Sequence, residues 1–181
     1  MRYFAATLLA ASSLLTINAH GQGTWKMSYH DDVMNGKHGV MFEVEATGST
    51  ETLNVQCRDG KRVDVVVRTG NVIENLPSSK YSITQQTLSM GANGQRMVPD
   101  YQRAVLIKFD TKKPQLEQWD LGPATGEVSA TRAKDHLKQI LKASVFYVQF
   151  KPSAAQEKTL EFPVAGLDRY KAELKENCGV E

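Results

Sequence analysis

Apolar and polar side chains alternate at every second residue through much of this chain, and that pattern limits the fold most strongly. In the runs Leu53–Arg58 and Lys61–Arg68, the apolar residues share one face and the polar residues the other. Alternation with a period of two indicates a strand with one buried face. Asp59-Gly60 lies between the two runs and tolerates the positive φ angles of a two-residue turn. We therefore expect an antiparallel hairpin here.

The same alternation predicts further strands on both sides of the hairpin. They span Thr24–Tyr29, Val40–Ala46, Arg103–Asp110, Leu116–Leu121, Val145–Phe150 and Thr159–Val164, with weaker signals at Val72-Ile73 and Tyr81–Thr84. Between the first two strands, residues 31–36 end in Asn-Gly, which favours a turn-rich connection.

Two helices are expected in the C-terminal half. Ala130–Ala143 gathers its apolar residues on one stripe, with Ser129 or Thr131 as the capping residue, and Leu167–Asn177 has a similar three- and four-residue spacing. Strands followed by helix, strands and helix indicate a mainly β or α+β domain. We expect an antiparallel β-sandwich or a partly open barrel with these two helices.

The N-terminus has the features of a cleavable secretory signal. A positive start at Met1-Arg2 precedes an apolar run over Tyr3–Ile17, and Ala19-His20-Gly21 offers the small residues that signal peptidase accepts. We expect a signal peptide over 1–21 and a single β-rich domain over 22–181, with a cut after Ala19 as the alternative. The run is shorter than the roughly 20 residues of a membrane span, so the mature protein is expected to be periplasmic or secreted.

The expected compartment bears on the two cysteines, Cys57 and Cys178. Two thiols in one small exported domain most simply form one disulfide. Cys57 falls on the apolar face of its strand and Cys178 on the apolar face of the last helix. Both should therefore point toward a core, which favours a Cys57–Cys178 bond over a reactive or metal-binding thiol.

The sequence assigns no catalytic residue, cofactor or metal. The net charge of +2 is close to neutral and gives no reason to expect nucleic acid as a partner. A nucleophile elbow, a glycine-rich phosphate loop and a Cys-x-x-Cys pair are all missing from the sequence. An enzyme is therefore the less favoured interpretation.

His30, Asp31, Asp32 and His38 form the one place where potential metal ligands crowd together. Their spacing matches none of the familiar zinc patterns. A solvated turn, in which the aspartates bond to the local backbone, is the favoured interpretation. A small hydrolase that uses the His30–His38 region remains an alternative.

Two other groups of titratable residues, Glu43 with Glu45 and the single His136, are not interpreted as functional sites. Glu43 and Glu45 share one strand face, but it is the polar face, where nothing would raise the pKa of an acid. His136 lies among lysines on the first predicted helix, and we expect it at the surface.

Aromatic residues are spread over most of the predicted strands, and core packing is expected for most of them. An exposed tyrosine or tryptophan at a sheet edge would indicate a contact with a protein or a glycan. The sequence does not identify which of them is exposed. Met90–Pro99 is expected to form a loop around Asn93-Gly94.

The order of several elements resembles a group of exported bacterial proteins, the periplasmic proteins associated with type VI secretion of the VasI kind. The residues that carry this resemblance are Trp25, Asp32, Met34, Cys57, the strand Arg103–Asp110, the segment Phe162–Leu167, Tyr170, Leu174 and Cys178. In that group an Asp-Pro-like step follows the first strand, whereas this chain has Asp32-Val33. The resemblance implies an exported β-rich accessory domain and transfers no functional residue.

These observations lead to three functional hypotheses. The first is a non-enzymatic binding or accessory module of the cell envelope, whose expected partners are envelope proteins or secretion machinery. The second is an inhibitor or immunity-type protein that blocks an envelope enzyme through the Met90–Pro99 loop. The third is the small envelope hydrolase.

Overall fold

The computed structural model describes residues 23–32, 37–58, 62–74, 89–90, 96–97, 102–122, 126–153 and 155–180. The expected signal peptide and Tyr81–Thr84 lie outside these ranges. Within them, ten strands form one sheet in the order β1-β2-β3-β4-β10-β9-β8-β11-β12, with β5 paired to β11. Their bounds are β1 Lys26–Asp32, β2 Lys37–Glu45, β3 Thr52–Arg58, β4 Arg62–Arg68, β5 Ile73–Glu74, β8 Gln102–Phe109, β9 Gln115–Leu121, β10 Glu127–Ala130, β11 Val145–Pro152 and β12 Lys158–Pro163.

The first four strands form a meander, and the alternation in the sequence explains it. Val40 pairs with Cys57, and Cys57 with Val63, so the apolar side chains of β2, β3 and β4 line up on one face. Two details differ from expectation. β1 continues through Asp31 and Asp32, because both residues pair with β2. Arg58 pairs with Arg62, which leaves three residues, instead of two, between β3 and β4.

The second half of the sheet also pairs antiparallel throughout. It contains β10, which the sequence patterns did not indicate. Ser129 pairs with Val66 of β4 and with Asp120 of β9, so it belongs to the sheet and does not cap a helix. The first helix, α1, consequently spans Ala133–Ile140, and Arg132 precedes it without a side-chain capping bond. The short β10 joins the two halves into one sheet.

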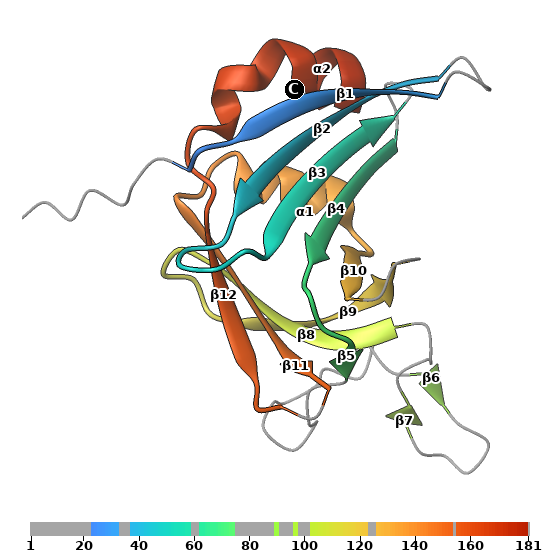
Figure 1. The fold of residues 1–181 in the computed structure, drawn as a ribbon, viewed down its shortest axis with the longest axis vertical. Coiled ribbons are helices and arrows are strands. Elements are labelled where there is room, and N and C mark those ends of the chain that lie inside the picture. The colour runs from blue at the N-terminus through green and yellow to red at the C-terminus, as the bar shows by residue number, and fades with distance from the viewer. Residues whose placement is uncertain are drawn as a thin grey trace, which may run out of the picture.

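The sheet is strongly bent but open. In Figure 1, β8 and β9 cross below β1 to β4 at a steep angle. The bend brings the start of β1 close to the end of β12. Trp25, just before β1, donates a hydrogen bond from its indole Nε1 to the carbonyl oxygen of Val164, just after β12, at 3.0 Å. The Thr47 amide donates to the carbonyl oxygen of Glu161 at 2.8 Å. This open, curved sheet corresponds to the partly open barrel of the two expected architectures.

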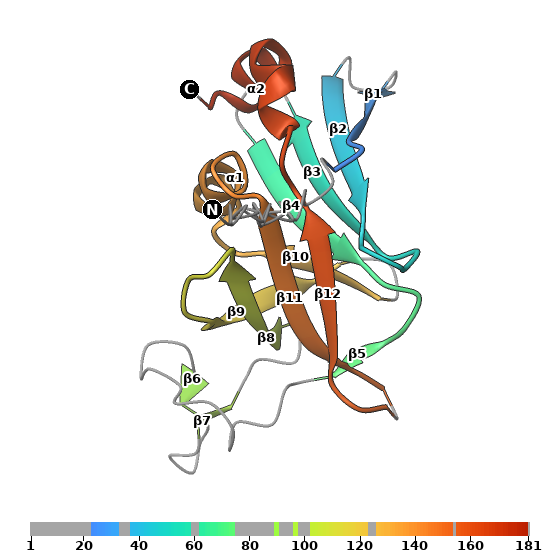
Figure 2. The ribbon, with the colours of Figure 1, turned by 90° about the vertical axis from the view of Figure 1, so that its left-hand side faces the viewer.

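Both helices lie on the same side of the sheet in Figure 2, and their buried residues belong to the apolar core. Helix α1 contacts β4 and β10, and α2 (Lys171–Cys178), which follows the 3-10 helix Leu167–Tyr170, contacts β2 and β3. The structure joins Cys57 to Cys178, the disulfide expected from the sequence. The two C-terminal helices and the β-rich class therefore agree with the sequence-based expectation. No helix in the described ranges is long and apolar enough to cross a membrane.

Candidate functional site

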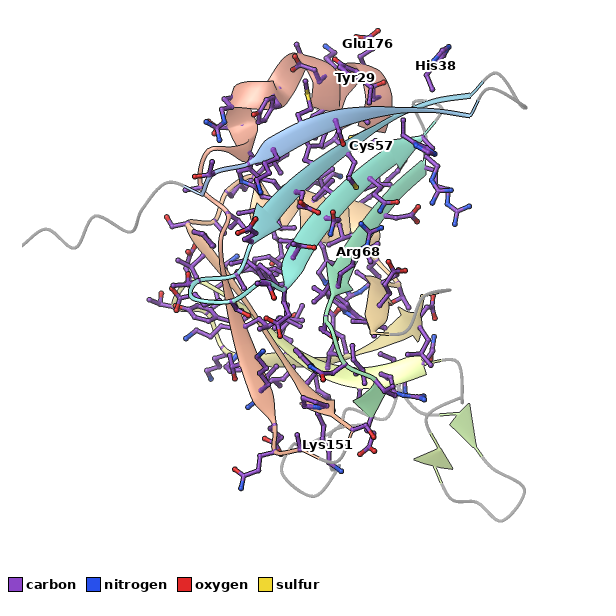
Figure 3. All side chains as sticks on the ribbon, viewed as in Figure 1. Tyr29, His38, Cys57, Arg68, Lys151 and Glu176 are labelled. Carbon is purple, nitrogen blue, oxygen red and sulfur yellow. A yellow bond between two sulfur atoms is a disulfide. The ribbon has the colours of Figure 1, made fainter. Side chains whose placement is uncertain are left out.

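The face of β1–β4 opposite the helices carries polar side chains, and we call it the polar face. Cross-strand pairing arranges this face in rows. One row runs from His30 through Gly39 and Arg58 to Arg62, and the next contains Ser28, Met41, Gln56 and Asp64. Arg68 lies near the middle of this face in Figure 3. Tyr29 alternates with Ser28 and His30 and pairs with Val40, so its side chain points to the other side of β1.

A hollow of about 400 Å³ opens on the polar face beside β1, and we call it the edge hollow. Its lining includes Ser28, His30, Met41, Gln56, Arg58 and Arg68. Gly39 also lines it, and because glycine has no side chain, the space between His30 and Arg58 stays open. The edge hollow is therefore a consequence of one glycine in a row of long side chains.

The edge hollow combines apolar surface with several hydrogen-bond donors. Two guanidinium groups, a hydroxyl, an amide and an imidazole line it, and among the described residues no aspartate or glutamate belongs to its lining. A neighbouring hollow of about 470 Å³ shares Gln56, Arg58 and Arg68 but also contains Asp64, Asp120 and Glu127. The edge hollow is thus the part of the polar face that suits an electron-rich group.

The arginines of the polar face are held by two carboxylates. Nη2 of Arg58 lies 3.1 Å from Oδ2 of Asp64, and Nε of Arg62 lies 3.4 Å from the same oxygen. Nε of Arg68 lies 2.6 Å from Oε1 of Glu127. These contacts orient the guanidinium groups, and each arginine keeps further N–H groups beyond the one engaged by a carboxylate.

Tyr29 is the most exposed large apolar residue in the described part of the chain. Its exposed fraction is 65%, and Val72 follows with 52%. Tyr29 lies on β1, which pairs with β2 alone among the described strands and so forms an edge of the sheet. The sequence could place Tyr29 on a strand, but its exposure depends on which strand forms the edge.

The suspected metal-ligating region divides between two faces. His30 pairs with Gly39 and Asp31 with His38. Adjacent residues of a strand point to opposite faces, so His30 lies on the polar face and His38 on the other. No group of three or more histidine, cysteine, aspartate or glutamate side chains in the described ranges could hold a metal ion. Asp31 and Asp32 belong to a strand, and so the interpretation as a turn was wrong.

His136 was expected at the surface, and this expectation was wrong, because only 1% of the residue is exposed. Its ring packs against Trp119, with centroids 5.7 Å apart, and against Phe109 at 6.2 Å. Nδ1 donates to the carbonyl oxygen of Arg132 at 2.7 Å, since a carbonyl can only accept. The lysines around His136 in the sequence occupy other faces of the helix.

Glu117 is the buried partner of His136. Its Oε2 lies 2.9 Å from Nε2 of His136, although the two groups are not aligned for a good hydrogen bond. The indole of Trp119 donates to the same oxygen at 3.1 Å, and Arg132 reaches Oε1 at 2.5 Å. Glu117, His136 and Trp119 are buried, whereas Arg132 is largely exposed, and the cluster connects α1 to the sheet.

The remaining candidates from the sequence are the two glutamates Glu43 and Glu45 and the Met90–Pro99 segment. Glu45 is exposed and Glu43 is partly exposed on the polar face, as expected, and Glu45 pairs with Lys26 at 2.7 Å. Within the Met90–Pro99 segment, the structure describes a two-stranded ribbon of β6 (Ser89–Met90) and β7 (Arg96–Met97). The other residues of that segment lie outside the described ranges.

No family model, curated protein or solved structure matches this chain.

Proposed function

We propose that this protein is an exported, non-enzymatic binding module of the bacterial cell envelope whose partner protein covers the edge strand β1, with Tyr29 on one side of the strand and the edge hollow on the other. One observation carries the proposal: a tyrosine that is 65% exposed lies on an edge strand beside a hollow lined by donors. Tyrosine is enriched at protein interfaces because it offers a large apolar ring and a hydroxyl group.

Two further features support the export part of the proposal. The Cys57–Cys178 disulfide suits an oxidising compartment, and residues 1–21 have the pattern of a cleavable signal. The resemblance to VasI-type proteins suggests that the partner belongs to a secretion system. Export places this partner in the periplasm or outside the cell.

Expression of the full chain in a bacterial host tests export. We expect the protein in the periplasmic fraction or the medium, with Gln22 as its first residue by N-terminal sequencing and both cysteines oxidised. An intact signal peptide in the cytosolic fraction would show that the export proposal is wrong.

A matched pair of substitutions tests the binding surface. Immobilised wild-type mature protein should retain a specific protein from envelope extract, and Tyr29→Ala should weaken this retention roughly 30-fold, as for an interface hot spot of about 2 kcal/mol. Val72→Ala, which truncates the other exposed apolar side chain, should leave retention unchanged. Equal effects of the two substitutions would contradict the proposal, and retention of a glycan alone would assign a different class of partner.

The inhibitor hypothesis has one observation in its favour, the β6–β7 ribbon, which among the described strands pairs with none of the main sheet. A short ribbon of this kind can present a loop to an enzyme cleft. Replacement of residues 91–95 by a glycine-serine linker should abolish inhibition of an envelope enzyme if that hypothesis is correct, and should leave retention through Tyr29 intact.

A further inference from the structure

The chemistry of the edge hollow identifies the group that a partner would place in it. We infer that the edge hollow receives a carboxylate of the partner protein, bound by the guanidinium groups of Arg58 and Arg68. This inference rests on the proposed function, because it takes the polar side of the β1 edge as part of the binding surface.

The first argument is the geometry of the donors. Arg58 and Arg68 lie on the neighbouring strands β3 and β4, and both line the edge hollow. Arg58 engages Asp64 through Nη2, and Arg68 engages Glu127 through Nε. Each planar guanidinium has five N–H groups, so donors remain for a second acceptor. The amide of Gln56 and the hydroxyl of Ser28 add to the same lining.

The second argument is orientation before binding. The carboxylates of Asp64 and Glu127 already hold the two guanidinium groups in place, with N–O distances of 3.1 and 2.6 Å. Gln56 and Arg68 both approach the sulfur of Met41, at 3.8 and 4.0 Å. Side chains that are ordered in the free protein lose less conformational entropy when a ligand binds.

The third argument concerns charge. Within the described part of the chain, Arg58 and Arg62 form ion pairs with Asp64, and Arg68 forms one with Glu127. This network of three cations and two anions carries one excess positive charge, and one carboxylate neutralises that excess. A phosphate group with nearly two charges would add repulsion from Asp64 and Glu127, and it therefore fits less well.

The chain supplies a well-matched control for this site. Arg58 and Arg62 share the carboxylate of Asp64, so either substitution leaves Asp64 with one arginine partner. Of the two, only Arg58 lines the edge hollow. A comparison of Arg58→Gln with Arg62→Gln thus separates loss of a ligand contact from loss of an ion pair.

The experiment is an NMR titration of purified, oxidised mature protein at constant ionic strength, read on the arginine Nε–H signals. Five probes are used: an acetylated alanine dipeptide with a free C-terminus, its C-terminal amide, an amidated peptide that contains one aspartate, inorganic phosphate, and glucuronate. We expect saturable shifts at Arg58 and Arg68 with a carboxylate probe, and binding at least about ten-fold weaker for the neutral amide. The free dipeptide and the aspartate peptide distinguish a C-terminal carboxylate from a side-chain carboxylate.

In the same titration, Arg58→Gln should weaken binding roughly ten-fold or more, whereas Arg62→Gln should stay within about two-fold of the wild type. Equal losses in the two variants, or tighter binding of inorganic phosphate than of either carboxylate peptide, would overturn the inference. Binding of glucuronate without either peptide would also overturn it, in favour of an acidic glycan. If no carboxylate probe binds, the inference is wrong. The proposed function would still be supported in that case if Tyr29→Ala weakens retention of the envelope protein.

Discussion

Glu117 shows how one buried side chain depends on its neighbours for its charge. Burial alone opposes ionisation of this carboxyl group, but His136, Trp119 and Arg132 act against burial and hold its pKa below the ordinary value of 4.5. Only 6% of Glu117 is exposed, so loss of the negative charge would leave the buried His136 and Trp119 without their charged acceptor. Removal of one member of a buried polar network is costly for that reason.

The direction of this pKa shift predicts how stability changes with pH. Because the folded-state pKa lies below the unfolded-state pKa, the contribution of Glu117 is complete at neutral pH and is lost as the pH falls below about 4.5. Glu117→Gln should lower the free energy of unfolding by about 2 kcal/mol at pH 7, and the difference from wild type should shrink toward pH 3. Urea unfolding from pH 7 to pH 3 measures this difference.

The exposed Glu45 provides the control for that experiment. Glu45→Gln removes a surface ion pair with Lys26, and we expect a change of no more than about 0.5 kcal/mol. A Glu117→Gln effect that stays constant over the whole pH range would contradict the assignment of a depressed pKa.

The short strand β10 depends on one turn residue. The backbone oxygen of Gly126 accepts hydrogen bonds from the amide and the hydroxyl of Thr69, at 2.8 and 3.2 Å. Gly126 has a φ angle of +83°, and a Cβ atom there would lie 2.3 Å from the backbone oxygen of Thr69. Only glycine fits both the backbone conformation and the space, so this position determines how β10 joins β4.

A comparison of two glycines tests this role. Gly126→Ala should destabilise the protein by about 3 kcal/mol or more, because it adds a backbone clash to the cost of a positive φ. Gly48 has a similar φ of +68°, but a Cβ atom added there would meet no described atom within 4 Å, so Gly48→Ala should cost only about 1 kcal/mol. Thermal and urea unfolding of both variants provide the measurement, and equal costs would show that space around Gly126 is not limiting.

At the scale of the whole molecule, the disulfide joins the first half of the chain to its last helix. Cys57 on β3 and Cys178 on α2 are 121 residues apart. The Trp25–Val164 hydrogen bond and the bond from Tyr170 to the carbonyl oxygen of Trp25, at 3.1 Å, connect the same two regions. The C-terminal helix is thus held on the apolar face of β2 and β3 by a covalent bond and by packing.

Loss of this covalent bond should be measurable as a loss of stability. For a loop of this length the chain-entropy model gives roughly 4–5 kcal/mol as an upper value for the cross-link. We expect Cys57→Ala/Cys178→Ala to lower the free energy of urea unfolding by several kcal/mol. A reducing agent should destabilise the wild type and leave the double variant unchanged. Two free thiols in periplasmic material, found by mass measurement without reduction, would contradict the disulfide.

The β-rich class, most strand positions, the two C-terminal helices and the inward direction of Cys57 and Cys178 could be predicted from the amino-acid sequence. These features follow from local alternation and helical periodicity, which depend on neighbours within a few residues. For the same reason, local patterns missed β10, which pairs with β9 and with the distant β4, where Arg68 lies 59 residues before Glu127. They also placed His136 at the surface, because its neighbours in the sequence are lysines. Those lysines lie on other sides of the helix, so they do not show that His136 is exposed.

The position of the candidate site, in contrast, depends on how the strands assemble. The alternation places Arg58, Arg68 and Tyr29 on strands, but it does not state which strands are neighbours, which one forms an edge, or where the side chain missing at Gly39 leaves a hollow. Those facts follow from cross-strand register and sheet order, which are set by contacts between residues far apart in the chain.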